Sequence, residues 1–445
     1  MSFQVPGQAT EQFLLAAKHA EIHTLEQLAA SCEVVMAVSA LIHQLQRERG
    51  ISNIYLASKG QHFSEQRLGQ VRQSLSSEQN LRGLLNSHYL DAKKPEGSLR
   101  LLNSIAFVLQ GLDNLAALRA QVDHRKISAL ESTRAFCRLI AGLLSVVFEA
   151  ADIASDPAVT RVLVALFNLM QGKEYAGQER AWAAIGFAAG RFDPELCDRL
   201  GHLQEAQQRS FEVFTEFSSD ELCQQWQALE DSKVTAELNQ LRGMIRRLCQ
   251  GEPIAPELSE IWYDLATRRI DQMRLLENAL ADTLRYVGQQ RITQARNDLN
   301  AHRKRLEALA TIDAPTSSPL TMLFDPEAPG LYGADAVALV PSERAAPPDL
   351  ARSVYDLVRG QAEHIKQMGD ELDEARRALT DRKQIERAKG LLMHNLKLTE
   401  EQAFRRMQKR AMEQNTRLAE VAESLIEAAE QVKEQARRDK RAKSR

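Results

Sequence analysis

Apolar residues recur at spacings of three and four positions through most of the first 310 residues, which is the period of amphipathic α-helices. The segments with this pattern are Phe13–Leu28, Val34–Leu56, Leu99–Leu118, Phe136–Ile153, Val162–Phe187, Leu196–Phe217, Leu238–Leu248 and Ile261–Leu276. Between two of them, Ser155-Asp156-Pro157 has the residue order of a helix start, with a capping residue before proline. No stretch shows the alternation typical of strands. The pattern therefore predicts an all-α fold, with a helical bundle over residues 1–312.

The pattern changes between residues 313 and 350, which hold seven of the 13 prolines and predict a semi-rigid linker. Over residues 351–380 the spacing then alternates between four and three. The positions are Val354, Val358, Gln361, Ile365, Met368, Leu372, Ala375 and Leu379, of which only Gln361 is polar. This heptad pattern predicts a coiled-coil helix that pairs with another helix, either within the chain or in a homodimer.

Residues 381–445 read as short amphipathic helices, one of which has a capping box at Thr399-Glu400-Glu401-Gln402. The chain has a net charge of −3, but residues 381–410 contain nine Lys and Arg against four Asp and Glu. A short basic module on an acidic chain indicates a polyanionic partner such as nucleic acid, whereas a charge run without a partner is a solvated helix face. Eight of the nine fill the outward positions of these helices: Arg382, Lys383, Arg387, Lys389, Arg405, Arg406, Lys409 and Arg410.

Other function classes are disfavoured. The five cysteines are scattered and odd in number, which argues against a disulfide framework and a zinc site. The chain has no phosphate-binding loop, nucleophile elbow or metal-spaced histidine cluster, and His43 and His394 fit helix-surface or packing positions, so we expect no enzyme. The N-terminus lacks a signal-peptide pattern, and the most apolar stretch, Leu139–Phe148, is too short to span a bilayer. We expect a cytoplasmic protein without a cofactor.

Arginines fall on several of the apolar helix stripes, at Arg49, Arg180, Arg242 and Arg269. A buried arginine is costly unless it is paired. One explanation is an internal ion pair with an acid such as Glu48, Glu174, Glu179 or Asp264. The other is a site for a small anion, because a guanidinium offers a planar fork of donors to two oxygens.

The basic module resembles a known family. The run Ile385-Glu386-Arg387-Ala388-Lys389-Gly390-Leu391-Leu392-Met393, followed by Glu401-Gln402-Ala403-Phe404, Ala411-Met412 and Leu418-Ala419-Glu420-Val421-Ala422, is similar to an ANTAR domain. That family consists of three-helix modules of bacterial antiterminators. The resemblance implies binding to paired stem-loops of leader mRNA, with Lys389, Arg406 and Lys409 as the leading contacts.

Three runs in the first half resemble a second family. They are Leu45-Gln46-Arg47-Glu48-Arg49-Gly50-Ile51-Ser52-Asn53-Ile54-Tyr55-Leu56, Gln171-Gly172-Lys173-Glu174-Tyr175-Ala176-Gly177-Gln178-Glu179-Arg180-Ala181 and Trp262-Tyr263-Asp264-Leu265-Ala266-Thr267-Arg268-Arg269-Ile270-Asp271. All three are similar to the NIT domain, an all-helical module that senses nitrate and nitrite. Residues 231–256 match nothing in that pattern and read as an insertion. The chain as a whole resembles the NasR-type nitrate-responsive transcription antiterminators.

The resemblance implies that arginines of different helices clamp the anion. Arg49 fits the motif best, Arg269 is the expected second clamp because its helical phase is better than that of Arg268, and Arg180 is a ligand or a support. Arg242 lies on an apolar helix stripe but not in any of the three runs, so we expect it in an internal ion pair. The expected function is antitermination that depends on nitrate or nitrite. The alternative is an anion sensor that acts through protein contact by the coiled-coil helix.

Overall fold

The computed structural model describes residues 8–90, 98–249, 258–310, 349–398 and 400–443, and every regular element in these ranges is a helix. The prediction of an all-α fold is confirmed. The first unit contains α1 (Gln8–Ala57), α2 (Ser64–Leu85), the short π-helix η1 (Asn86–Leu90), α3 (Leu99–Asp113), α4 (Leu115–Asp123), α5 (Ala129–Ile153), α6 (Pro157–Ala189), α7 (Pro194–Phe217), α8 (Asp220–Glu230), α9 (Lys233–Leu248) and α10 (Leu258–Ala310). The second contains α12 (Asp349–Leu396), α13 (Glu400–Gln414) and α14 (Leu418–Lys443).

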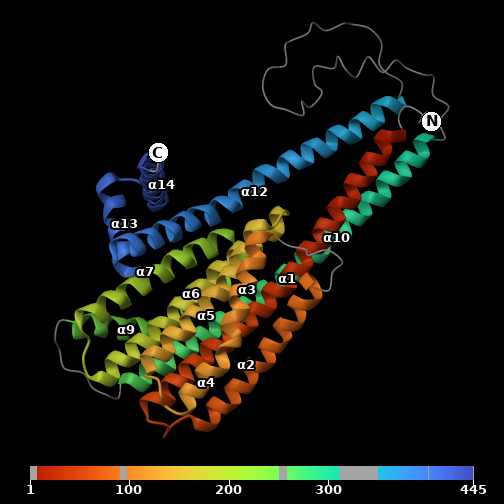
Figure 1. Cartoon of the computed structure of the whole chain (residues 1–445). Coiled ribbons are helices and arrows are strands. Elements are labelled where there is room, and N and C mark those ends of the chain that lie inside the picture. The colour runs from red at the N-terminus through yellow and green to blue at the C-terminus, as the bar shows by residue number, and fades with distance from the viewer. Residues whose placement is uncertain (1–7, 91–97, 250–257, 311–348, 399, 444–445) are drawn as a thin grey trace.

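The first unit is a bundle around α1, α5, α6 and α10, which pack against one another along much of their length (Figure 1). Leu41, Ile42 and Leu45 of α1 are fully buried in its main apolar cluster. The two apolar segments predicted within residues 13–56 belong to the single helix α1. The predicted start of α6 is also present, since the Asp156 carboxylate accepts a hydrogen bond from the Val159 amide and Pro157 is the first helical residue.

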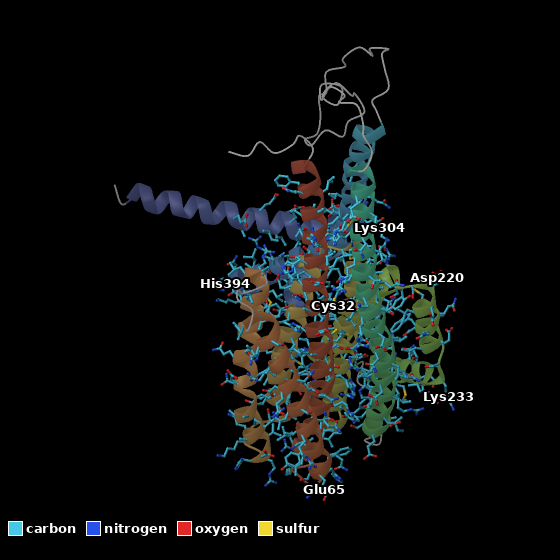
Figure 2. All side chains as sticks on the ribbon, turned by 90° about the vertical axis from the view of Figure 1, so that its right-hand side faces the viewer. Cys32, Glu65, Asp220, Lys233, Lys304 and His394 are labelled. Carbon is cyan, nitrogen blue, oxygen red and sulfur yellow. A yellow bond between two sulfur atoms is a disulfide. The ribbon has the colours of Figure 1, made fainter. Side chains whose placement is uncertain are left out.

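A small second cluster joins the start of α7 to α9 and the start of α10. Figure 2 shows Asp220 of α8 and Lys233 of α9 on one flank of α10, toward the side opposite His394 of α12. Val234, Leu238 and Ile245 of α9 pack here, so the stretch that matched no family pattern contains a regular amphipathic helix. Cys197 and Cys249 form a disulfide in this region. The scattered cysteines argued against a disulfide framework, and that expectation did not anticipate this bond between residues 52 positions apart.

The second unit begins with the long helix α12, which continues without a break through the predicted boundary between residues 380 and 381. Of the heptad residues, Ala375 and Leu379 are buried in the main cluster of the bundle, whereas Ile365 is 68% exposed. The C-terminal part of the heptad seam thus pairs within the chain, against α5 and α6. The side chains of the earlier heptad positions, Val354, Val358 and Gln361, and the predicted capping residue Thr399 lie outside the described residues.

The helices α12, α13 and α14 share a compact apolar core of their own. It includes Ala388, Ala403, Met407, Val421 and Ala422, all of which are buried. Figure 1 shows α13 and α14 at the end of α12 beyond the start of α7, with only α12 running back along the bundle. The C-terminal module is therefore a separate folded unit that rests on the bundle.

Two segments, Gln12–Ala57 and Leu99–Asp123, are long and apolar enough to cross a membrane by length and composition alone. In α1, 56% of that window is buried inside the structure. Buried core helices of soluble proteins can have the same length and composition as membrane-spanning helices, so the two segments are weak evidence for a membrane span.

Charged side chains cross the centre of the bundle. Lys173 of α6 and Glu277 of α10 are fully buried and form an ion pair, and Glu277 also accepts a hydrogen bond from Ser39 of α1 at 2.5 Å. Arg274 lies 3.0 Å from Glu277. His43 is 9% exposed beside this cluster, and its Nδ1 has no hydrogen-bond partner. Burial, together with the positive charges of Lys173 and Arg274, lowers the pKa of His43 to about 3.

His43 therefore stays neutral in the folded protein while it gains a proton in the unfolded chain, whose histidine pKa is about 6.5. Stability from this group is complete above pH 6.5 and falls by roughly 1.4 kcal/mol per pH unit below it. Between pH 6.5 and pH 5, the free energy of unfolding should therefore fall by about 2 kcal/mol less in His43→Gln than in the unchanged chain. Urea denaturation at the two pH values measures this difference. The exposed His62→Gln is the control, and equal losses in both variants would contradict the prediction.

Candidate functional site

Arg49 lies near the C-terminal end of α1, fully buried between α5 and α6. Its guanidinium reaches both oxygens of Glu174 from α6, with Nη1 to Oε1 at 2.5 Å and Nη2 to Oε2 at 3.2 Å. Nη1 also contacts Cys137 Sγ at 3.0 Å, while Nε has no hydrogen-bond partner. Burial lowers the pKa of Arg49, but the Glu174 carboxylate and Cys137 outweigh this and raise it above the usual value. The internal ion pair expected for a buried arginine is thus present.

Arg180 of α6 is buried between α1 and α10. Its Nη1 donates to Thr267 Oγ1 at 2.8 Å and its Nη2 to the Gln46 carbonyl at 3.4 Å, and its guanidinium lies over the Tyr263 ring. Its Nε has no hydrogen-bond partner, and none of the ion pairs in the described part of the chain involves Arg180. A fixed cation without an acid beside it leaves net positive charge here.

Two glycines allow these arginines to lie so close to the neighbouring helices. A Cβ on Gly50 would lie 2.8 Å from Arg180 Nη2 and 2.6 Å from the Tyr263 hydroxyl, and one on Gly177 would lie 2.6 Å from Arg49 Nη2. Both glycines occur in the sequence runs that carry the family resemblance. Their spacing beside the arginines was the available signal, but sequence reasoning did not single them out as parts of the site.

Arg269 of α10 lies in a different polar cluster, which faces α7, α8 and α9. Its Nη2 donates to Glu230 Oε1 at 2.5 Å, and its Nε and Nη1 have no hydrogen-bond partner. Burial and the nearby charge of Arg242 lower the pKa of Arg269. Among the described residues, Arg269 shares no ion-pair or hydrogen-bond partner with Arg49 or Arg180.

Arg242 forms the internal ion pair that was expected for it. Its Nε and Nη2 reach the two oxygens of Glu179 at 2.8 and 2.6 Å, and Nη2 also donates to Gln207 at 3.0 Å. The Arg242 charge holds the pKa of Glu179 below its usual value despite burial. The four arginines on apolar stripes therefore divide into two that surround the end of α1 and two that face α7, α8 and α9.

The structure brings Arg49 and Arg180 together through Gln46. The Gln46 side chain donates to Glu174 Oε2 at 2.9 Å, and its backbone carbonyl accepts from Arg180. Gln178 donates to the other Glu174 oxygen at 2.9 Å. Glu174 is thus held by Arg49 and two amides, and a displaced carboxylate would leave the planar fork of Arg49 available to another anion.

Part of the basic module contacts the bundle. Arg382 donates to the Tyr175 hydroxyl at 3.5 Å and lies over the Phe167 ring, and Lys383 lies 3.3 Å from Asp152. Arg405 meets both oxygens of Asp198 on α7, at 2.8 and 2.9 Å.

The rest of the basic module does not touch the bundle through a described ion pair. Arg406, Lys409 and Arg410 are exposed on α13, and Lys409 lies 3.8 Å from Glu413 of the same helix. Arg387 pairs with Glu430 of α14 at 2.5 Å, and the buried Lys389 pairs with Glu386 at 2.8 Å. The eight predicted RNA-binding residues therefore fall into a docked set (Arg382, Lys383 and Arg405), an open set (Arg406, Lys409 and Arg410) and two residues that pair within the module, Arg387 and the buried Lys389.

A cavity of about 560 Å³ lies between the bundle and α12. Cys137 and Glu174, which contact Arg49, line one side of it, and Arg382 and Lys389 line the other. The acid partner of the buried arginine and the basic residues of the C-terminal module thus border the same space.

Comparisons with known proteins agree with this division into two units. A family model described as nitrate and nitrite sensing, NIT, matches residues 40–285, and an ANTAR domain model matches residues 373–426. The chain is 34% identical over 418 residues to the nitrate regulatory protein of Klebsiella oxytoca, covering 92% of this chain and 93% of that protein. The solved structure of the NasR transcription antiterminator matches with a TM-score of 0.56 and 29% identity, over 94% of this chain and 98% of that one. Both resemblances seen in the sequence are confirmed. The chain belongs to the family of nitrate- and nitrite-sensing proteins that combine an N-terminal NIT domain with a C-terminal ANTAR domain.

Proposed function

We propose that this protein is a nitrate- or nitrite-responsive regulator of transcription antitermination, and that it binds hairpins of leader mRNA when the anion occupies the NIT domain. The domain order and the relatives named above support this function. The chemistry is binding rather than catalysis, and it needs no cofactor. A cytoplasmic location follows from the same assignment, because nascent RNA is the partner.

The anion site that we propose is centred on Arg49. Nitrate is planar and singly charged, and it could take the place of the Glu174 carboxylate on the guanidinium fork. Arg180, which has no acid partner, adds positive charge on the other side of Gln46. Arg269 has two donor atoms without partners but lies in another polar cluster. It could join the same anion only through a change in how α10 lies against α1, and nitrate would favour such a change.

Nitrate would then act by releasing the ANTAR domain from the bundle. The observation that carries this step is the docked set of basic residues, since Arg382, Lys383 and Arg405 are engaged by the bundle. RNA and the bundle compete for these side chains. Glu174 connects the two events because it contacts Arg49 and also borders the cavity beside α12.

The experiment that tests this function is a nitrate titration of the full-length protein in the presence of a leader hairpin pair, read by RNA binding. Nitrate should increase RNA affinity in a saturable way, and nitrite should be compared in parallel. RNA binding that is independent of both anions would contradict the proposal.

A second candidate function is signalling by protein contact through the heptad helix. Ile365 is 68% exposed on a seam of apolar positions, which leaves a surface for a second copy of the chain or for another protein. Light scattering with and without nitrate separates this function from the first. A change of assembly state without RNA binding would favour contact signalling.

For the open set, we expect Arg406→Glu or Lys409→Glu to weaken RNA binding while nitrate affinity stays the same. Each phosphate contact that is lost should reduce the slope of log affinity against log salt by about one. Binding measured by fluorescence anisotropy at several salt concentrations tests this. Arg246→Glu, an exposed arginine on α9, is the control for the change in net charge, and an unchanged slope in the first two variants would remove them from the RNA interface.

A further inference from the structure

The cavity beside α12 has the properties of a second ligand site, separate from the buried arginines of the NIT domain. Its volume of about 560 Å³ lies within the range of roughly 300–1,000 Å³ that is typical of small-molecule sites. Helices α5, α6 and α7 of the bundle form one side, and α12 forms the other (Figure 1). A ligand held there would touch both units of the protein.

The lining of this cavity has a large excess of positive charge. The cations are Arg134, Arg138, Arg199, Arg382, Lys383 and Lys389, and the acids are only Glu174 and Glu386. Both acids already have partners, because Arg49 holds Glu174 and Lys389 holds Glu386. Among the described residues, no ion pair involves Arg134, Arg138 or Arg382. Lys383 is balanced by Asp152 at 3.3 Å, so the charges that face this space outside a described ion pair are those of Arg134 and Arg138 on α5 and of Arg382 on α12.

Two of these guanidinium groups are oriented by aromatic rings. Arg199 lies 4.0 Å from the centre of the Trp182 ring, and Arg382 lies 5.0 Å from that of Phe167. Stacking uses the flat face of a guanidinium and turns its N–H edge toward polar partners, which for Arg382 include the neutral Tyr175 hydroxyl at 3.5 Å. Nitrate, with one charge, suits one or two such groups. A set of cations spread over a cavity of this size suits a larger anion with several charges.

We infer that this cavity binds a small polyanion with two or more phosphate groups, such as a nucleoside triphosphate. Phosphate oxygens match guanidinium forks, and Arg134 and Arg138 of α5 together with Arg382 of α12 would hold the same ligand from opposite sides. A ligand that bridges the two units favours the docked arrangement over the released one. If the proposed function holds, the polyanion opposes the release of the ANTAR domain that nitrate favours, and so reduces RNA binding.

The test uses the full-length protein, with pyrophosphate and ATP as probes and AMP as a ligand with a single phosphate. Calorimetry should detect binding of pyrophosphate and ATP, and the double variant Arg134→Gln/Arg138→Gln should weaken it at least ten-fold. Both arginines are exposed on α5, so the variant should fold normally. The matched control Arg246→Gln/Arg247→Gln removes two exposed arginines from α9 and should bind both probes as before. ATP that binds while pyrophosphate does not would assign the site to nucleotides and not to phosphate chains in general.

RNA binding without nitrate gives the second readout. ATP or pyrophosphate should reduce it in the unchanged chain and in the control, but not in Arg134→Gln/Arg138→Gln. The inference is wrong if neither probe binds at millimolar concentration, or if both double variants lose binding equally. It is also wrong if the probes still inhibit RNA binding in Arg134→Gln/Arg138→Gln, because the polyanion would then compete directly for the RNA surface. The effect of nitrate on RNA binding is measured separately without polyanion, so a failure of the proposed function is distinguishable.

Discussion

Replacing Arg49 by lysine is expected to weaken nitrate binding about 100-fold while the protein stays folded. Lysine keeps a positive charge beside Glu174, so the buried carboxylate retains an ion-pair partner. It loses the planar fork that can meet two oxygens of one anion. Losing one hydrogen bond to a charged group costs about 1.5–3 kcal/mol, and about 2.7 kcal/mol corresponds to two orders of magnitude in affinity. Isothermal calorimetry measures the change directly.

The matched control for this variant is Arg242→Lys. Arg242 is also largely buried and also meets both oxygens of a glutamate, but it lies in the cluster that faces α7, α8 and α9. Its replacement should lower stability and leave nitrate affinity within about two-fold. Nitrate binding that survives in Arg49→Lys, or falls equally in both variants, would remove Arg49 from the anion site. Alanine is less suitable here, because removing one partner of a buried ion pair costs about 3–5 kcal/mol of stability.

Replacing Asp198 by arginine is expected to raise RNA affinity in the absence of nitrate by roughly five- to ten-fold. Asp198 lies on the bundle and accepts two hydrogen bonds from Arg405, and these bonds hold the pKa of Asp198 below its usual value. The substitution turns this attraction into repulsion. An exposed ion pair contributes up to about 1 kcal/mol, and the repulsion adds to its loss. Because Asp198 is outside the ANTAR domain, the substitution leaves all eight basic residues that we propose for the RNA interface unchanged.

A gel shift with the leader hairpin pair, done with and without nitrate, measures this release. Glu216→Arg makes the same charge change on the same helix, about 27 Å further along α7 by the rise of an α-helix, and should leave RNA binding unchanged. Increased affinity in both variants would indicate a general charge effect. Unchanged affinity in Asp198→Arg would mean that the contact between α7 and α13 does not restrain the ANTAR domain.

The apolar period predicted the helices whose buried faces are hydrophobic, and it failed where those faces are polar. Helix α2 buries Arg67, Gln70, Ser74 and Glu78 along one side, so no apolar stripe marks it in the sequence. An internal ion pair of Arg242 could be predicted because Arg242 lies on an apolar helix stripe, and its partner Glu179 is one of the acids considered for such pairs. The partner of Arg269 could not, since Glu230 comes from α8, a helix that was not predicted.

Contacts between distant parts of the chain were the second feature that could not be predicted from the sequence. The bond between Cys197 and Cys249 depends on how α7 and α9 meet, and no spacing in the sequence encodes that. The heptad pattern indicated that α12 pairs with a helix but could not specify which one. The basic module likewise gave no sign that Arg382, Lys383 and Arg405 would be held by the bundle. A charge pattern identifies a basic surface, but whether another part of the chain covers that surface depends on the tertiary structure.

The continuity of α12 determines how far a very small ligand can move the C-terminal unit. Leu379 in the buried seam and Ala388 in the ANTAR core are nine residues apart on one unbroken helix, which corresponds to about 14 Å. A stiff rod of that kind has no joint at which a displacement can be absorbed. If the proposed release tilts α12 at the seam, the displacement of α13 and α14 would grow with their distance from the seam along this helix and would not depend on the size of the anion.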